Sequence, residues 1–249
     1  LWIIAILLLC PAQGVLASDA GGVVITHHES LEELSFGRQK FGWAAAGSET
    51  EPVPLAFQAL GQLFELELEP NERLLTQAFK GRVPDEIGVY RGRLAGNADS
   101  WVRLVVSNGT PSGLVWDGKQ MFAIEPRAGR PGTGSAVIFR LRDVYVQPGT
   151  MSCGTSAGPA VDFATVYEEV TAELSEAVAE AAVALEQLNI GVVGDFEFTH
   201  VLGGAAEAEL LARINNVDGI FSEQLGVQIT AREVDTFSDV NDPFTASAP

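Results

Sequence analysis

Few residues of this chain have side chains that could perform catalysis or bind a metal ion. The sequence holds two cysteines, Cys10 and Cys153, and three histidines, His27, His28 and His200. The first two histidines are neighbours, so on a strand or a helix they point in different directions and make a poor metal pair. We therefore expect them to be surface or loop histidines, and we expect His200 to lie in a loop. Cys10 and Cys153 carry the only thiols of the sequence.

Cys153 lies in the segment 147–159, which is rich in Gly, Ser, Thr and Pro and therefore predicts a linker. A thiolate is a strong, soft ligand for Zn²⁺. Two alternatives stand beside metal binding, namely a buried structural thiol and a disulfide between two chains. Buried cysteines are typical of apolar surroundings, which this polar segment does not offer.

Oxygen-bearing side chains gather toward the end of the sequence. Asp235, Asp239, Asn241 and Asp242 could supply the oxygen ligands that Ca²⁺ prefers, but their spacing is not that of a calcium-binding loop. A solvated turn is the simpler interpretation. Asp195 follows an apolar run, and we expect it to cap a helix or a loop.

The first residues predict export from the cell. Leu1–Leu9 is an apolar run, and small residues up to Ala17 follow it, which is the pattern of a signal peptide. The run has roughly half the length that a bilayer-spanning helix needs. A lipid anchor on Cys10 is the alternative. We expect a signal peptide over residues 1–17, truncated at its N-terminus, a secreted product and no membrane anchor. Removal of this peptide leaves Cys153 as the single cysteine.

Composition limits the fold and the partners of the chain. With 249 residues, of which 47% are hydrophobic, the chain can form one large core or two modest ones. The formal net charge is −18. Such a charge repels nucleic acids and anionic membrane surfaces, so we expect neither as a partner.

The region 57–146 predicts an antiparallel sheet of five to seven strands. Within Phe64–Glu69 apolar residues alternate with glutamates, which is typical of a strand with one buried face. The dipeptide Asp117-Gly118 predicts a tight primed turn between two strands. The predicted strands are Phe64–Glu69, Trp101–Val106, the two arms of a hairpin over Leu114–Ile124, and Ala136–Val146.

The last third of the chain predicts helices and buried strands. Apolar residues at helical spacing predict a long amphipathic helix over 163–188. The nearly all-apolar run 189–195 predicts a strand buried on both faces. A second helix over 205–224 and a strand over 227–237 complete a βαβ unit. The predicted fold class is thus α+β in two parts, a β-rich antiparallel domain followed by the first βαβ unit of an α/β domain.

Four stretches of the β-rich region carry a family resemblance. They are Tyr90–Gly96, Ser100–Leu104, Gly109–Leu114 and Phe122–Pro126. Over roughly residues 60–155 the chain looks like the propeptide of reprolysin-type metalloproteases, the metzincin group that includes the ADAM and snake-venom enzymes.

A second resemblance covers residues 188–237. The run Asn189–Asp195, followed by Ile214–Val217, looks like the opening strand and first helix of the reprolysin catalytic domain. Between the two regions, Met151-Ser152-Cys153-Gly154 is similar to the cysteine-switch element of these propeptides, with Ser152 inserted. The resemblance implies that the Cys153 thiolate occupies the open coordination position of a catalytic zinc until the chain is cut.

The resemblance also implies how the chain is divided. Residues 1–17 would be the signal peptide, 18–160 the propeptide, 161–188 a connecting helix and 189–249 the start of a zinc metalloendopeptidase domain. Protein or peptide substrates would follow. The sequence lacks HExxHxxGxxH, the zinc-binding motif of such enzymes. We therefore expect the histidine ligands beyond residue 249 and expect this chain alone to be inactive.

Two further inferences depend on the resemblance. Some family members bind calcium with an acidic residue where this chain has Asn189, and an amide is the poorer ligand. The alternative function is a non-enzymatic secreted binding or adhesion protein whose α/β part is a degenerate protease domain. The sequence after residue 249 distinguishes these functions.

Overall fold

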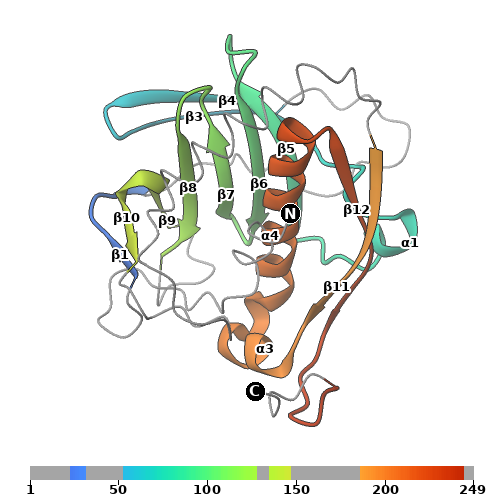
Figure 1. The fold of residues 1–249 in the computed structure, drawn as a ribbon. Helices are drawn as coiled ribbons and strands as arrows, with labels where there is room; N and C mark the ends of the chain where they lie inside the picture. Colours follow the sequence, from blue (N-terminus) through green and yellow to red (C-terminus); the bar gives the residue numbers. More distant parts are fainter. Residues whose placement is uncertain (1–22, 32–52, 128–134, 147–185, 244–249) are drawn as a thin grey trace.

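A computed structural model gives the fold of residues 23–31, 53–127, 135–146 and 186–243. We call the described residues between 23 and 146 the sheet body, and residues 186–243 the α4 unit. The sheet body is antiparallel, and the α4 unit has two parallel strands joined through helices (Figure 1). This arrangement is compatible with the predicted α+β class. The predicted signal peptide, the residue Cys153 and the predicted helix up to residue 185 lie outside the described residues.

Eight strands of the sheet body form one antiparallel sheet in the order β2-β9-β8-β7-β6-β5-β4-β3. Seven of these strands, β3 to β9, come from the region for which five to seven strands were predicted, and β2 precedes that region. A small separate sheet pairs β1 (Val23–Ile25) with β10 (Val144–Val146). The strands of the large sheet are β2 (Glu29–Leu31), β3 (Val53–Ala59), β4 (Gln62–Pro70), β5 (Ile87–Leu94), β6 (Trp101–Ser107), β7 (Thr110–Trp116), β8 (Met121–Pro126) and β9 (Ala136–Arg140).

The strand pattern read from the sequence is confirmed in β4 and β6 and corrected at two places. The β7–β8 hairpin forms, but four residues, Asp117 to Gln120, connect its arms, because Trp116 pairs with Met121. Gly118 has a positive φ but Asp117 does not, so the predicted tight turn with Asp117 and Gly118 as its two central residues is wrong. The predicted strand Ala136–Val146 is broken, since the short helix η2 (Leu141–Asp143) separates β9 from β10.

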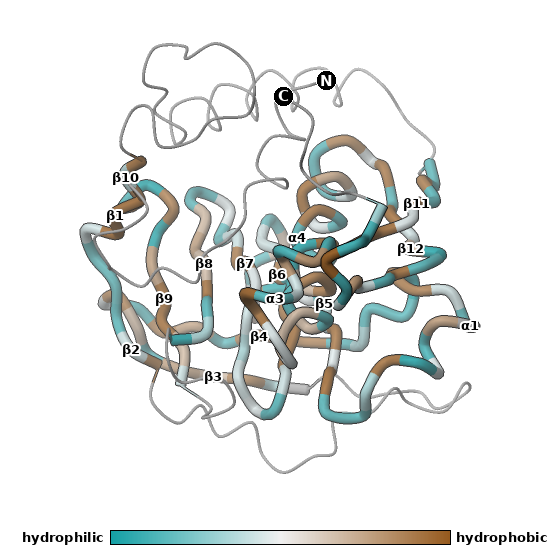
Figure 2. Tube along the Cα trace, turned by 90° about the horizontal axis from the view of Figure 1, so that it is seen from below, coloured by the Kyte–Doolittle hydropathy of each residue, from teal (hydrophilic) through white to brown (hydrophobic). Residues whose placement is uncertain are grey.

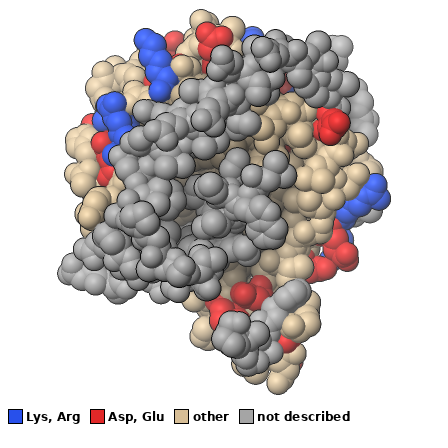
Figure 3. Space-filling model, in the orientation of Figure 1, with Lys and Arg blue, Asp and Glu red and all other residues tan. Residues whose placement is uncertain are grey.

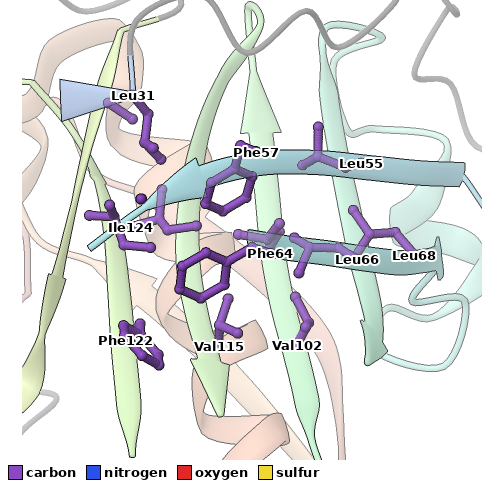
Figure 4. Packing of buried hydrophobic residues seen from close by; sticks show 14 of the residues in the cluster. Leu31, Leu55, Phe57, Phe64, Leu66, Leu68, Val102, Val115, Phe122 and Ile124 are labelled. Carbon is purple, nitrogen blue, oxygen red and sulfur yellow. The ribbon is translucent and has the colours of Figure 1, made fainter. Parts of the chain in front are cut away.

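The large sheet curls, so that residues from both of its ends share one core. The β3–β4 hairpin lies across β6, β7 and β8, and the ring of Phe64 stacks on Phe57 and meets Phe122 edge-on, each pair with ring centroids 5.0 Å apart (Figure 4). Leu31 of β2 joins the same cluster. All members of this cluster come from the sheet body, between residues 31 and 138.

The backbone of Leu60 links the two ends of the curled sheet. Leu60 lies in the tight turn between β3 and β4, where it and Gly61 both have positive φ. Its N–H donates to Glu29 Oε2 of β2 at 2.8 Å, and its carbonyl accepts from the Arg140 guanidinium of β9 at 3.0 Å. We call these two hydrogen bonds the Leu60 clasp.

The α4 unit has the βαβ connectivity predicted from the sequence. Strands β11 (Glu186–Gly194) and β12 (Val227–Thr236) pair in parallel, with α3 (Phe196–Leu202), η3 (Gly203–Ala205) and α4 (Ala206–Gln224) between them. The bounds of α4 and β12 lie within one residue of the prediction. Residues 186–188 are strand, however, so the predicted helix does not reach residue 188. Their backbone groups pair with β12, a partner that sequence periodicity does not reveal.

Helix α4 lies between the large sheet and the β11–β12 pair (Figure 2). One face of β6 therefore meets the β3–β4 hairpin and the other face meets α4. The short helix α1 (Gln77–Lys80) of the sheet body contributes Phe79 to this second layer. The second core mixes residues of the sheet body, such as Val89 and Val105, with Leu211 and Ile214 of α4.

The described part of the chain contains no helix that is long and apolar enough to cross a membrane.

Candidate functional site at the contact between the sheet body and α4

A buried ion pair joins β6 to α4. The Arg103 guanidinium donates from Nε to Asp218 Oδ2 at 3.1 Å, and the two residues are 2% and 0% exposed. Arg103 also donates to the Val102 carbonyl of its own strand and to Ser222 Oγ of α4. Charged groups are buried in proteins only when such partners replace water. The sheet body and the α4 unit are thus connected by a charge pair in a dry environment.

The Asp218 carboxylate serves three segments of the fold at once. Besides Arg103, its Oδ2 accepts from the Arg73 guanidinium at 2.9 Å and from the Asn71 amide at 3.3 Å, both in the segment after β4. Its Oδ1 accepts from the backbone N–H of Ile229 in β12 at 3.1 Å. Asp218 therefore fixes β6, the segment after β4 and β12 around one point on α4.

Asn215 lies one helical turn before Asp218 and bonds the backbone of two strands. Its amide nitrogen donates to the carbonyls of Tyr90 in β5 at 2.9 Å and Leu104 in β6 at 3.2 Å. Its carbonyl oxygen accepts from the Asn71 amide at 2.8 Å. The three hydrogen bonds of Asn215 and the four of Asp218 together fix both the position and the rotation of α4 on the sheet. We call Asn71, Arg73, Arg103, Asn215 and Asp218 the polar seam.

Gly219 lets α4 approach the sheet closely. A Cβ atom at Gly219 would lie 2.6 Å from Arg103 Cγ and 2.8 Å from the Trp101 ring, which is closer than atoms can pack. The Arg103 guanidinium lies over the ring of Trp101, 5.9 Å from its centroid. Glycine at this position is thus required by packing against β6, not by its backbone conformation.

Further hydrogen bonds join the segment after β4 to β12. The backbone N–H of Ala231 donates to the Leu74 carbonyl at 2.7 Å, and the N–H of Thr76 donates back to the Ala231 carbonyl at 3.3 Å. The Thr230 hydroxyl donates to the Arg73 carbonyl. The sheet body therefore provides a short parallel bridge along β12, opposite the edge that pairs with β11.

Burial shifts the pKa values of Arg103, within the polar seam, and of Tyr90, whose backbone carbonyl binds Asn215. Loss of water lowers the pKa of the Arg103 guanidinium, although Asp218 and Glu223 oppose the shift. Burial also raises the pKa of the Tyr90 phenol. Arginine keeps its charge at physiological pH even after such a shift. The polar seam therefore keeps its positive charge across the physiological range.

The histidines singled out from the sequence lie apart from the polar seam. His27 and His28 are exposed between β1 and β2, in agreement with the prediction. His200 is exposed but belongs to α3, where its ring stacks on Phe196 at 5.3 Å, so the predicted loop position is wrong. Asp195 caps the start of this short helix and Gly203 follows its end, but the sequence pattern did not predict a helix here.

The acidic residues near the end of the chain are bound by protein groups. Asp195 caps α3 as predicted, accepting from the Phe198 N–H at 2.8 Å. Asp242 is buried and accepts from the Phe196 N–H at 2.6 Å, so it is not the solvated residue that the sequence suggested. Asp239 accepts from Asn241 within an exposed turn, and these hydrogen bonds lower its pKa.

No three His, Cys, Asp or Glu side chains approach one another closely enough to hold a metal ion, within the residues that the structure describes. Cys153 lies outside them. Asn189, the position of interest for calcium, is exposed on β11. On the face shown in Figure 3, described Lys and Arg side chains are scattered among acidic ones.

The polar seam was not predicted from the sequence, although the polar residues of α4 at helical spacing are one sign of it. Among the apolar residues of α4, Ile214 is buried and Val217 is partly buried, whereas the neighbouring Asn215 and Asp218 are fully buried. Polar residues at helical spacing normally indicate a solvated face. A helix buried on two sides breaks that rule. Arg103, the partner of Asp218, lies 115 positions away in the sequence.

No protein-family model matches this chain, and a search among curated proteins found no match either.

Proposed function

We propose that this chain is the N-terminal part of a secreted zinc metalloendopeptidase precursor, including its inhibitory propeptide. In this proposal residues 18–160 are the propeptide and residues 189–249 begin the catalytic domain. The observation that carries it is the burial of α4 against the sheet body through Asp218 and Arg103. A propeptide that silences an enzyme needs such a specific, dry contact with the domain it inhibits. The βαβ order of β11, α4 and β12 agrees with the resemblance.

The chain's own residues would bind and orient in this function. The sheet body would hold α4 and β12 in place through the polar seam, and the segment between Val146 and Glu186 would present the Cys153 thiolate to the metal of the complete precursor. The described residues do not form a zinc site themselves. We therefore assign the hydrolytic chemistry to the HExxHxxGxxH motif, which these 249 residues do not contain.

Metal content and activity of the complete precursor test this proposal. The precursor, secreted from a eukaryotic host, should contain one zinc ion per chain and should hydrolyse a casein-type substrate only after the residues up to about 160 are removed. A chelator should abolish that activity. A complete precursor that holds no zinc, or that stays inactive after removal of those residues and addition of zinc, would contradict the proposal.

A second function is a secreted binding or adhesion protein with a degenerate protease domain. The same experiment distinguishes the two, because a degenerate domain would be secreted and folded yet would bind no zinc. N-terminal sequencing of the product tests secretion, for which we expect cleavage after Ala17.

A further inference from the structure

The two parts of the molecule differ in how they build their cores. The cluster around Phe64 and Phe122 is made only of sheet-body residues. The second cluster needs both parts, since Leu211 and Ile214 of α4 pack against Val89 and Val105 of the sheet body. The sheet body thus has a core of its own, whereas the α4 unit completes its core only on the face formed by β5 and β6.

We propose that this face is a self-sufficient binding surface for the α4 unit, so that the two parts stay together after the chain between Val146 and Glu186 is cut. The proposal does not rest on the proposed function, because it concerns only contacts among described residues. If the chain is a zymogen, the proposal adds that cutting the connection does not by itself remove the inhibitor.

Affinity in this contact comes from apolar burial. Leu211 and Ala231 of the α4 unit are fully buried, as is Leu74 of the sheet body, and Val105 is 1% exposed. Burying each large aliphatic side chain contributes about 1.5–3 kcal/mol. The backbone bridge between Leu74 and Ala231 adds hydrogen bonds that hold the parts in register. Each of these contacts is made by residues outside the segment 147–185.

Specificity comes from the polar seam, and its sheet-body half is arranged in advance. Arg103 is held by the Val102 carbonyl and the ring of Trp101, which both belong to β6. A side chain that is already ordered loses less conformational entropy on binding. Asp218 then enters between Arg103 and Arg73, and a mispositioned helix would leave these charges buried without partners, at a cost of several kcal/mol.

Three observations indicate that the contact itself is strong, and that the two parts are not kept together merely by the covalent connection. The contact has a closely packed core, with Gly219 against Trp101. It has a bridge between backbones and a fully dehydrated ion pair. These are the features of energetically important centres in stable protein–protein interfaces.

A cut in the folded full chain tests the proposal. The recognition sequence of a site-specific protease is inserted between Gly158 and Pro159, the folded protein is cut, and the product is examined by size-exclusion chromatography and native mass spectrometry. We expect one particle that contains both pieces and stays intact on dilution to about 1 µM, which corresponds to about −8 kcal/mol of binding free energy. Separate elution of the two pieces without denaturant would overturn the proposal.

Matched variants show whether the polar seam controls the association. Arg103→Met keeps a long side chain on β6 but removes the charge that faces Asp218, and Arg93→Met removes an exposed charge of β5 that pairs with Glu67. After cutting, Arg103→Met should raise the dissociation constant roughly 30-fold or more. Arg93→Met should leave it unchanged. Equal effects of the two variants would contradict the role of the seam.

Each variant is tested for correct folding before it is cut, so that a folding defect is not mistaken for weaker binding between the two pieces. Circular dichroism and urea unfolding of each uncut variant identify any that do not fold. In that event Ser222→Ala, which removes only the hydroxyl that Arg103 contacts, replaces Arg103→Met, with Ser112→Ala of β7 as its control. A rise in the dissociation constant for Ser222→Ala alone supports the proposal, and no rise contradicts it.

Discussion

The carboxylate of Asp218 lies 3.1 Å from the Arg103 guanidinium, across a contact between parts of the chain that are 115 residues apart. Neither side chain reaches water. The carboxylate also accepts from the backbone of β12, so a single acidic group on α4 meets both neighbouring layers. The stability of the fold should therefore depend on this group more than on any exposed acid.

Replacing Asp218 with Asn tests this dependence. The variant keeps the shape but leaves the Arg103 and Arg73 charges without a buried counter-charge, and we expect unfolding in urea to require about 3–5 kcal/mol less free energy. Asp235→Asn is the control, since Asp235 meets Arg82 only at the surface, at 3.7 Å. The control should lose no more than about 1 kcal/mol. Similar losses would mean that the pair is not dehydrated in solution.

Gly219→Ala tests the close approach of α4 to β6. The added methyl group would overlap Arg103 Cγ and the Trp101 ring, so α4 must shift, and overpacking of this kind costs roughly 1–3 kcal/mol. The better helix propensity of alanine offsets about 1 kcal/mol of this. Gly204→Ala, with open space around it, is the control. In thermal unfolding only Gly219→Ala should lower the Tm, and a raised Tm would refute the close contact.

The Leu60 clasp predicts a role for Glu29. Glu29→Ala removes the acceptor of the buried Leu60 N–H, and we expect a loss of about 1.5–3 kcal/mol in the free energy of unfolding, the range for hydrogen bonds to charged groups. Glu69→Ala, whose partner Arg91 lies on the exposed side of β5, is the matched control and should cost less than about 1 kcal/mol. Chemical denaturation measures both. An unchanged free energy of unfolding in Glu29→Ala would mean that the ends of the sheet are held together by their apolar core alone.

Cys153 can be tested only in the complete precursor of the proposed protease. Cys153→Ala, or capping of the thiol with a mercurial, should release peptide hydrolysis before any cleavage, because water then returns to the open zinc position. Ser152→Ala, the neighbouring substitution, should leave the precursor silent. If Cys153→Ala is equally silent, inhibition comes from the sheet body and not from the thiol.

The spacing of basic residues makes a prediction about activation. From Asp143 to Leu211 the sequence contains no Lys or Arg, so trypsin-like and furin-like proteases have no site there. We expect activation by self-cleavage or by a protease of another specificity. N-terminal sequencing of the mature enzyme checks this, and an N-terminus that directly follows Lys or Arg contradicts it.

The elements that were predicted correctly are those in which each face has the same surroundings, core or water, along the whole element. In β4 one face meets the core and the other meets water, so Phe64, Leu66 and Leu68 alternate with glutamates. The helix α4 and the strand β12 were predicted nearly to the residue. Strand β3 was missed, because its residues Val53–Ala59 include a proline and lack a regular alternation. Its strand conformation depends on pairing with β4.

The candidate site depends on relationships that local patterns do not contain. Arg103 was predicted to lie in a strand, but nothing nearby in sequence indicates that its guanidinium is buried. Asn71 and Asn215 meet only because the sheet and the α4 unit pack together. Residues 186–188 were predicted as helix, since their pairing with β12 is a long-range contact. Long-range packing and strand pairing, rather than weak local propensity, explain these errors.

The Leu60 clasp also bears on how the protein avoids self-association. A sheet with open ends presents unpaired backbone groups to which other chains can add strands. In this sheet the end strands β2 and β3 are drawn together at Leu60, and β2 has only three residues. A molecule whose clasp is open would expose the outer edge of β3, with Leu55 and Phe57 beside it. Aggregation should therefore begin at the β3 edge, and Glu29 and Arg140 would act against it.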